Sequence, residues 1–165
     1  MTGRVILLCG LPGSGKTTLA RQLAAELTAV RMCPDEWMAA LGVDLWDRAA
    51  RARVEALQWT QTLELVRHGL TVVIEWGVWS RAERDVARAE GRRAGAAVEL
   101  RFLDVPLEEL WRRLDARDAR VGAGEVVIDR ASLESWWEMI ERPTAEELAR
   151  FDPPETVGRR DRLVP

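Results

Sequence analysis

The chain has 165 residues, of which 47% are hydrophobic and 31% charged, and its formal net charge is −3 at pH 7. These values predict a single globular domain over residues 1–165, and the interspersed charges without a basic tail argue against binding to long nucleic acids. No apolar run reaches the roughly 20 residues of a membrane span, and the first strand begins too early to leave room for a signal peptide. We therefore expect a cytoplasmic protein that does not enter a membrane.

The first element is a strand followed by a glycine-rich loop and a helix. The apolar run at 4–9 predicts a buried strand, and leucines spaced by four residues predict an amphipathic helix over 16–27. Between them, the residues from Gly10 to Thr17 read GLPGSGKT and fit the pattern G-x-x-x-x-G-K-[ST] at every fixed position. A chance glycine-rich turn is the alternative, but the strand before the loop and the helix after it are the context that the pattern requires.

The residue types of this loop suit a triphosphate. Glycines allow the backbone to curl around phosphate oxygens, and the start of the helix offers free N–H groups and a positive dipole end. Lys16 is the only lysine in the chain, and a compact ammonium fits a phosphate cradle better than a guanidinium does. We predict that a nucleoside triphosphate is held by Gly10, Leu11, Pro12, Gly13, Ser14, Gly15, Lys16, Thr17 and Thr18, with the hydroxyl of Thr17 on Mg²⁺.

The rest of the chain alternates strands and helices, which predicts a parallel sheet with helices on both faces. The long helix expected over 47–68 carries an apolar stripe predicted to face the sheet, at Ala52, Ala56, Trp59, Leu63 and Val66. A last segment, 157–164, could form a fifth strand or lie loose. The other expected strands are 29–33, 70–75 and 97–104, and the other expected helices are 35–41, 80–94, one from Pro106, 132–141 and one from Thr144.

Three carboxylates, Asp35, Glu75 and Asp104, follow or end the predicted strands, at the edge of the sheet where ligands bind in such folds. Asp35 follows the second strand and could accept the proton of an acceptor hydroxyl, although it could also be a plain helix cap. Glu75 ends the third strand and could hold Mg²⁺ directly or through water, contact the acceptor, or face solvent without a role. Asp35 is our candidate catalytic base and Glu75 our candidate metal-side acid.

Arginines in the segment after the fourth strand could cover the phosphates. Arg113, Arg117 and Arg120 are spaced by four and three residues, so they share a helix face. We single out Arg117 and Arg120 as catalytic candidates on a short lid at about 117–131, whose closure would bring guanidiniums onto the phosphates. The alternative is a solvated basic face that pairs with Asp115 and Asp118.

Tryptophan is the dominant aromatic residue, with eight copies against two phenylalanines and no tyrosine. Trp59, Trp111, Trp136 and Trp137 lie on predicted helix faces and are expected in the core. The other four lie in predicted loops or turns near the nucleotide-binding edge, where they could stack on the acceptor or merely fill a hydrophobic lid. The candidate acceptor residues are therefore Asp35, Trp37, Trp46, Glu75, Trp76 and Trp79.

These features together resemble the small P-loop kinases often grouped with AAA-type ATPases, which include polynucleotide 5′-kinase, the zeta-toxin kinases and chloramphenicol phosphotransferase. The resemblance covers nearly the whole chain. It is carried by residues 10–18, C-P-D-E at 33–36, I-E-W-G-V-W-S-R-A-E-R at 74–84, L-D-V-P at 103–106, R-D-A-R at 117–120 and E-R-P-T-A-E-E at 141–147.

The resemblance implies a three-layer α-β-α fold with a parallel five-strand sheet in the order 2-3-1-4-5 and a short helical lid. It also implies that Asp35 is the acceptor base and that Arg117 and Arg120 are lid arginines. The sequence departs from the group at Glu75, where aspartate is more common, and it lacks the arginine that follows the base in polynucleotide kinases. The missing arginine favours a small acceptor over a nucleic-acid end.

The predicted function is transfer of the γ-phosphate of ATP to a hydroxyl of a small-molecule acceptor, with Mg²⁺ as cofactor. A kinase of nucleic-acid ends or nucleotides is the first alternative. The second is a nucleotide-binding switch or regulatory ATPase without a small acceptor. A GTPase is disfavoured, because the guanine-reading motif N-K-x-D needs a second lysine that the chain lacks.

Overall fold

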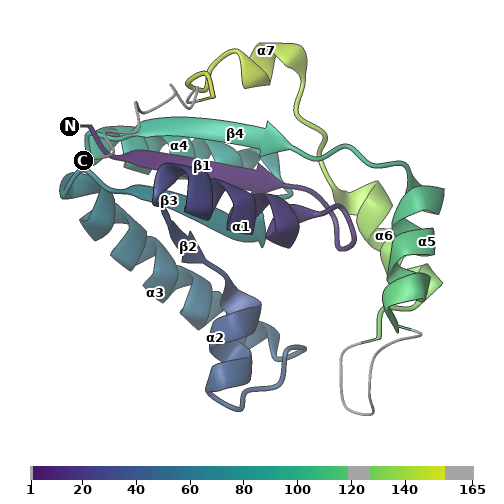
Figure 1. The fold of residues 1–165 in the computed structure, drawn as a ribbon. Coiled ribbons are helices and arrows are strands. Elements are labelled where there is room, and N and C mark those ends of the chain that lie inside the picture. Colours follow the sequence, from purple (N-terminus) through teal and green to yellow (C-terminus); the bar gives the residue numbers. More distant parts are fainter. Residues whose placement is uncertain (1, 119–126, 155–165) are drawn as a thin grey trace, which may run out of the picture.

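The computed structural model describes residues 2–118 and 127–154, which form a parallel sheet with helices on both faces (Figure 1). Its strand order is β2-β3-β1-β4, as predicted for the first four strands. The segment 157–164, proposed as a fifth strand, lies outside the described residues. The strands are β1 (Arg4–Cys9), β2 (Val30–Met32), β3 (Thr71–Gly77) and β4 (Ala97–Phe102).

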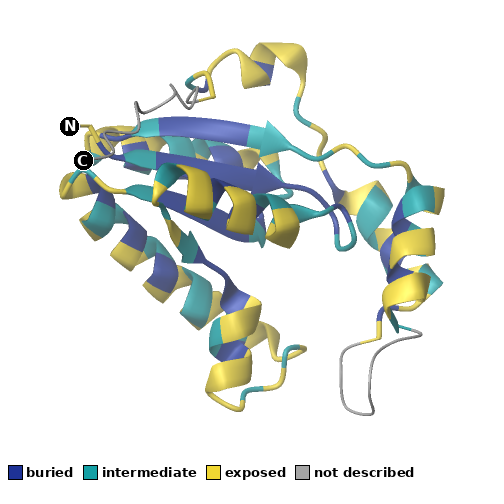
Figure 2. Cartoon of the chain, viewed as in Figure 1, coloured by how far each residue is buried: buried dark blue, intermediate teal, exposed yellow. Residues whose placement is uncertain are grey.

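Helices cover the sheet in two layers, which confirms the predicted three-layer architecture. Helix α1 packs on one face through a small cluster with Ile6, Leu8 and Val73, whereas alternate residues of the same strands, such as Leu7 and Ile74, belong to the larger core beneath α3 and α4. Figure 2 shows the sheet buried between helices whose outer sides are exposed. The helices are α1 (Lys16–Leu27), α2 (Pro34–Ala40), α3 (Arg48–Arg67), α4 (Arg81–Arg93), α5 (Leu107–Asp118), α6 (Arg130–Met139) and α7 (Ala145–Leu148).

Helix α3 buries only part of the stripe that the sequence predicts, since Val66 is buried and Trp59 and Leu63 are half-buried. Ala52 and Ala56 are exposed, whereas the buried residues of the helix include Gln58 and Thr62, both 0% exposed. The Thr62 hydroxyl donates to the Gln58 carbonyl oxygen at 2.8 Å, so its burial leaves no donor unpaired. The prediction assumed that only apolar side chains face the sheet, and on this helix polar side chains do so as well.

Among the described residues, no helix is long and apolar enough to cross a membrane.

A buried ion pair joins α4 to α7 near the carboxyl edge of the sheet. Arg84 and Glu147 are 0% and 2% exposed, and two parallel hydrogen bonds of 2.6 and 3.1 Å connect their guanidinium and carboxylate. Arg84 also donates to the carbonyl oxygens of Val78 and Trp79 at 3.1 and 2.9 Å. This pair therefore fixes the turn between β3 and α4, which reaches the glycine loop.

We predict that Glu147→Ala destabilises the protein by about 3–5 kcal/mol, because it leaves the Arg84 guanidinium buried without its counter-charge. Glu146→Ala changes the exposed neighbouring residue of α7 and should cost less than about 0.5 kcal/mol. Urea denaturation gives both free energies of unfolding. Equal values for the two variants would contradict a structural role for the pair.

Candidate functional site

The glycine loop joins β1 to α1 and has the backbone shape of a phosphate cradle. Gly13 and Gly15 have φ angles of 80° and 96°, a region that disfavours side chains. A Cβ atom at Gly13 would also lie 3.1 Å from Cγ of Leu114, because α5 packs directly against the loop. The Lys16 Nζ lies inside the curve and donates to the carbonyl oxygens of Gly10 and Leu11, both at 2.9 Å.

Lys16 is held in a partly desolvated position. Burial lowers the pKa of its ammonium from 10.5 to about 8, and the negative charges of Asp35 and Glu75 partly oppose this fall. Both candidate carboxylates therefore lie close enough to interact with the lysine of the loop. The structure brings Asp35, Glu75 and the loop together, as the sequence predicted from the ends of three strands.

Two features of the loop suit an anion. The Ser14 Oγ is buried and has no hydrogen-bond partner among the described residues, although such an atom costs about 1–3 kcal/mol when it stays unpaired. The N-terminus of α1 has no side-chain cap, and its first turn has no acidic residue. A phosphate group would satisfy both the hydroxyl and the free N–H groups, so these residues fit a bound triphosphate.

Arg113 is an arginine of this site that the sequence did not single out. Its Nη1 lies 3.4 Å from the Gly13 carbonyl oxygen, and its Nε donates to Glu109 at 2.7 Å. Helix spacing could identify it only as a neighbour of Arg117. Its contact with the loop depends on how α5 packs against the loop, and the spacing of residues along a helix gives no information about that packing. Arg117 lies in the last turn of α5 and donates to Asp118 at 2.8 Å, and Arg120 falls outside the described residues.

Glu75 is buried at 6% exposure rather than facing solvent. Its Oε1 accepts a 2.6 Å hydrogen bond from Nε of Arg31 on β2, and Arg31 also pairs with Glu36 at 2.9 Å. The other oxygen, Oε2, is buried without a partner in the described part of the chain. One oxygen is thus fixed by an ion pair while the other remains available to a ligand such as Mg²⁺ or its water.

Asp35 lies in the first turn of α2, after the helix cap at Cys33. Its carboxylate accepts a hydrogen bond from Nη2 of Arg51 on α3, 16 residues away along the chain. The sequence showed no arginine soon after Asp35, and the fold supplies one from the next helix instead. Asp35 is therefore not a plain helix cap but half of an exposed ion pair beside the loop.

The tryptophans divide into two groups. Trp79 donates its indole N–H to the Gly10 carbonyl oxygen at 3.1 Å, and its ring lies 5.9 Å from that of Trp136, which in turn lies 6.3 Å from Trp46. These three rings form a row that links the loop to α6 and to the connection between α2 and α3. Trp37 packs on the main core, and Trp76 packs there against Trp59 with an edge-to-face contact at 6.3 Å.

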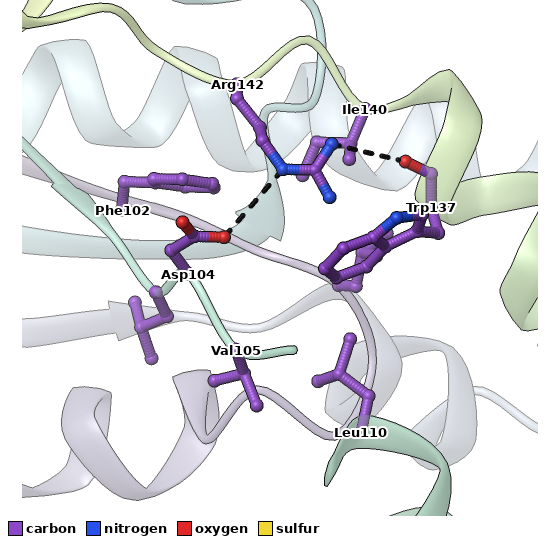
Figure 3. Close-up of a pocket in the computed structure, with 9 residues that line it drawn as sticks. Phe102, Asp104, Val105, Leu110, Trp137, Ile140 and Arg142 are labelled. Atoms are coloured by element: carbon purple, nitrogen blue, oxygen red, sulfur yellow. Dashed lines mark hydrogen bonds and ion pairs between the residues drawn. The ribbon is translucent and has the colours of Figure 1, made fainter. Parts of the chain in front are cut away.

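A small pocket is lined by Leu11 of the loop together with Leu110 and Ile140, and Figure 3 shows the latter two. Its volume of about 10 Å³ is close to the least that a single water molecule needs, so it is a packing gap rather than a ligand site. Arg142 lies between Asp104 and Trp137, with the guanidinium 4.0 Å from the ring centroid. Asp104, the carboxylate after β4, is thereby engaged away from the cradle, at 3.8 Å from Arg142.

A metal would have to be held together with a ligand. The described residues contain no cluster of three or more histidine, cysteine, aspartate or glutamate side chains able to bind one. Mg²⁺ commonly takes one or two protein oxygens with waters and phosphate oxygens, and the Thr17 hydroxyl with the free oxygen of Glu75 fits that pattern.

Comparison with solved structures identifies the same fold in several proteins. The chain aligns with a component of the Pnkp1/Rnl/Hen1 RNA repair complex over 97% of its own length at 21% identity and a TM-score of 0.74, and it spans about half, 50%, of that chain. It aligns with the APS kinase CysC of Mycobacterium tuberculosis, solved with AMPPNP and APS, at 23% identity and a TM-score of 0.60, covering 86% of this chain and 84% of that one. Kti12 of Chaetomium thermophilum, in complex with ADP-AlF3, aligns at 20% identity and a TM-score of 0.68, with coverages of 86% and 82%.

These likenesses establish the fold, and the family follows from the sequence. No curated protein sequence matches the chain at a significant level. A family model described as an AAA domain matches residues 5–143, which include the glycine loop, Asp35, Glu75 and all of α5 and α6. Among the proteins of the same fold, one is named as an APS kinase and another was solved with ADP-AlF3. The chain belongs to the AAA domain family of P-loop proteins.

Proposed function

We propose that the protein transfers the γ-phosphate of ATP to a hydroxyl group of a small-molecule acceptor. The observation that carries this proposal is the position of Asp35, in the first turn of α2 directly after β2, where its charge acts on the Lys16 ammonium of the loop. A carboxylate beside a phosphate-binding lysine is placed to accept a proton from a hydroxyl aligned with the γ-phosphate. A nucleotide-binding switch needs the loop but does not need this carboxylate.

Each residue of the site then has a role in the transfer. The loop from Gly10 to Thr18 binds the phosphates, with Lys16 contacting the β- and γ-phosphates. Asp35 deprotonates or orients the acceptor hydroxyl, and Arg117 and Arg120 neutralise charge on the transferred group. Thr17 and Glu75 would hold Mg²⁺, which neutralises phosphate charge when bound.

A kinase of nucleic-acid ends is the second candidate. Its support is the alignment over 97% of the chain with a component of an RNA repair complex. That candidate predicts transfer to 5′-hydroxyl oligonucleotides with a steep dependence on salt, because phosphate contacts release counterions. The small-molecule proposal predicts no transfer to such oligonucleotides and no steep dependence on salt.

We expect Asp35→Asn to lower acceptor phosphorylation by about 10²–10⁴-fold, since the amide cannot accept the proton. ATP affinity should stay within about twofold of the wild type, because Asp35 is assigned to the acceptor and not to the loop. Asp115→Asn, on the exposed side of α5, is the control and should change neither value. Acceptor-stimulated ADP release measures transfer, and unchanged release in Asp35→Asn would refute the base assignment.

We also expect ATP affinity to fall with rising pH. The pKa of Lys16 is about 8 in the free protein, and bound phosphates favour its charged form, so the bound pKa is higher. Affinity should therefore be constant just below pH 8 and decline above it by up to about tenfold per pH unit. Calorimetric titration with Mg-ATP from pH 7.5 to 9.5 tests this.

Lys16→Met provides the matched measurement for this titration. The variant should bind ATP more weakly but with an affinity that does not change over the same pH range, because the titrating group is gone. A decline of equal slope in the variant would assign the pH dependence to another group.

A further inference from the structure

A polar stripe runs along α3 from the site toward the core. Arg51, Glu55, Gln58 and Thr62 are spaced by four, three and four residues, so they lie on one side of the helix. Arg51 and Glu55 are half-buried, each with 31% of its side chain exposed, and Gln58 is fully buried. The stripe thus begins at Arg51, which contacts Asp35, and continues along α3 past Glu55 toward the core.

Because Gln58 is buried, this side of α3 is not simply a polar face in contact with solvent. Both its Nε2 and its Oε1 are buried without a hydrogen-bond partner among the described residues. An amide that stays unpaired costs free energy that an apolar residue of the same size would avoid. Its position, three residues after Glu55, provides one donor group and one acceptor at the inner end of the stripe.

The charges beside Asp35 are mostly negative. Arg51 lies between two carboxylates, because it donates to Asp35 and its Nη1 lies 3.7 Å from Oε1 of Glu55. Burial raises the pKa of Glu55, and the nearby carboxylates of Glu83 and Asp35 add to this rise while Arg51 opposes it. Arg48, one turn earlier on α3, adds one exposed positive charge. Around Glu55, the carboxylates of Asp35, Glu55 and Glu83 therefore outnumber the guanidiniums of Arg51 and Arg48, while Lys16, which also interacts with Asp35, belongs to the phosphate-binding loop.

An exposed aromatic side chain lies directly before the start of α3, the helix that carries Arg51 and Glu55. Trp46 belongs to the connection that runs from α2, which carries Asp35, to α3, which carries Arg51, and it is 52% exposed. Its ring lies 6.3 Å from that of Trp136. Exposed tryptophan faces next to a few fixed polar groups are typical of sites that bind ring compounds with many hydroxyl groups.

We propose that Arg51 and Glu55 form the acceptor subsite beside Asp35, and that this subsite takes a neutral or cationic polyhydroxylated ring compound in preference to an anionic one. The inference rests on the proposed phosphotransferase function and specifies its substrate class. Arg51 is already neutralised by two carboxylates, so a phosphate or carboxylate group on the acceptor would meet net repulsion. An uncharged hydroxyl or an amine would instead find a carboxylate, a guanidinium and an aromatic face.

The test separates acceptors by charge. A polar metabolite extract is divided on an anion-exchange resin at pH 7 into a retained anionic fraction and an unretained neutral and cationic fraction. Each fraction is incubated with the full chain and γ-labelled ATP, and labelled products are counted after removal of ATP. We expect at least about tenfold more transfer to the unretained fraction, and greater transfer to the anionic fraction overturns the inference while leaving the phosphotransferase intact. Absence of transfer in both fractions, with ATP still bound, refutes the proposed function and the inference that rests on it.

Variants of α3 test the assigned residues. Glu55→Lys should lower transfer to the unretained fraction by about tenfold or more, because it places a second positive charge beside Arg51 and removes the carboxylate. Its ATP affinity and melting temperature should match those of the control Glu64→Lys, which changes an exposed glutamate on the same helix. Glu55→Gln keeps the size of the side chain and its hydrogen-bonding oxygen, and it covers the case in which the lysine variant does not fold. Wild-type transfer by both folded variants overturns the assignment of Glu55.

Discussion

The site depends on one constraint, which is that a single ammonium group must stay charged inside a curl of backbone. Lys16 is surrounded by protein, its Nζ is held by two carbonyl oxygens of the loop, and burial lowers its pKa to about 8. Such a group is stabilised by negative charge. The fold provides it from Asp35, which follows β2, and from Glu75 on the neighbouring strand β3. A bound triphosphate would supply more of this negative charge. It would also accept a hydrogen bond from Ser14 Oγ, which is buried without a partner among the described residues.

The loop keeps its shape because other elements hold it from behind. Helix α5 packs on Gly13 so closely that a Cβ atom there would crowd Leu114, and Trp79 donates to the carbonyl oxygen of Gly10. Trp79 is positioned in turn by Arg84, which binds its carbonyl oxygen and pairs with Glu147. A buried ion pair between two helices thus supports the geometry of a loop to which neither residue belongs.

The two halves of the site differ in electrostatic character. The donor half has Lys16, the free N-terminus of α1 and Arg113 near the loop, so it attracts phosphates. The half beside Asp35 contains Arg51 between two carboxylates, and the row of tryptophans borders it. Under the proposed function, this contrast would let the protein hold a strongly anionic donor while favouring an acceptor of different charge.

The sequence by itself determined the loop and the carboxylates at the sheet edge, because these follow from local patterns and from the rule that parallel strands end at one edge. The order of the first four strands came from the resemblance to small P-loop kinases and agrees with the structure. The sequence predicted the buried face of α3 only in part, since apolar spacing cannot show that Gln58 and Thr62 are buried while Ala52 and Ala56 are exposed. Only the tertiary structure decided that Arg51 reaches Asp35, that Arg31 binds one oxygen of Glu75, and that Arg84 finds Glu147. These pairs join residues 16, 44 and 63 positions apart, and their contacts arise from how helices and strands pack against one another, which no local pattern encodes.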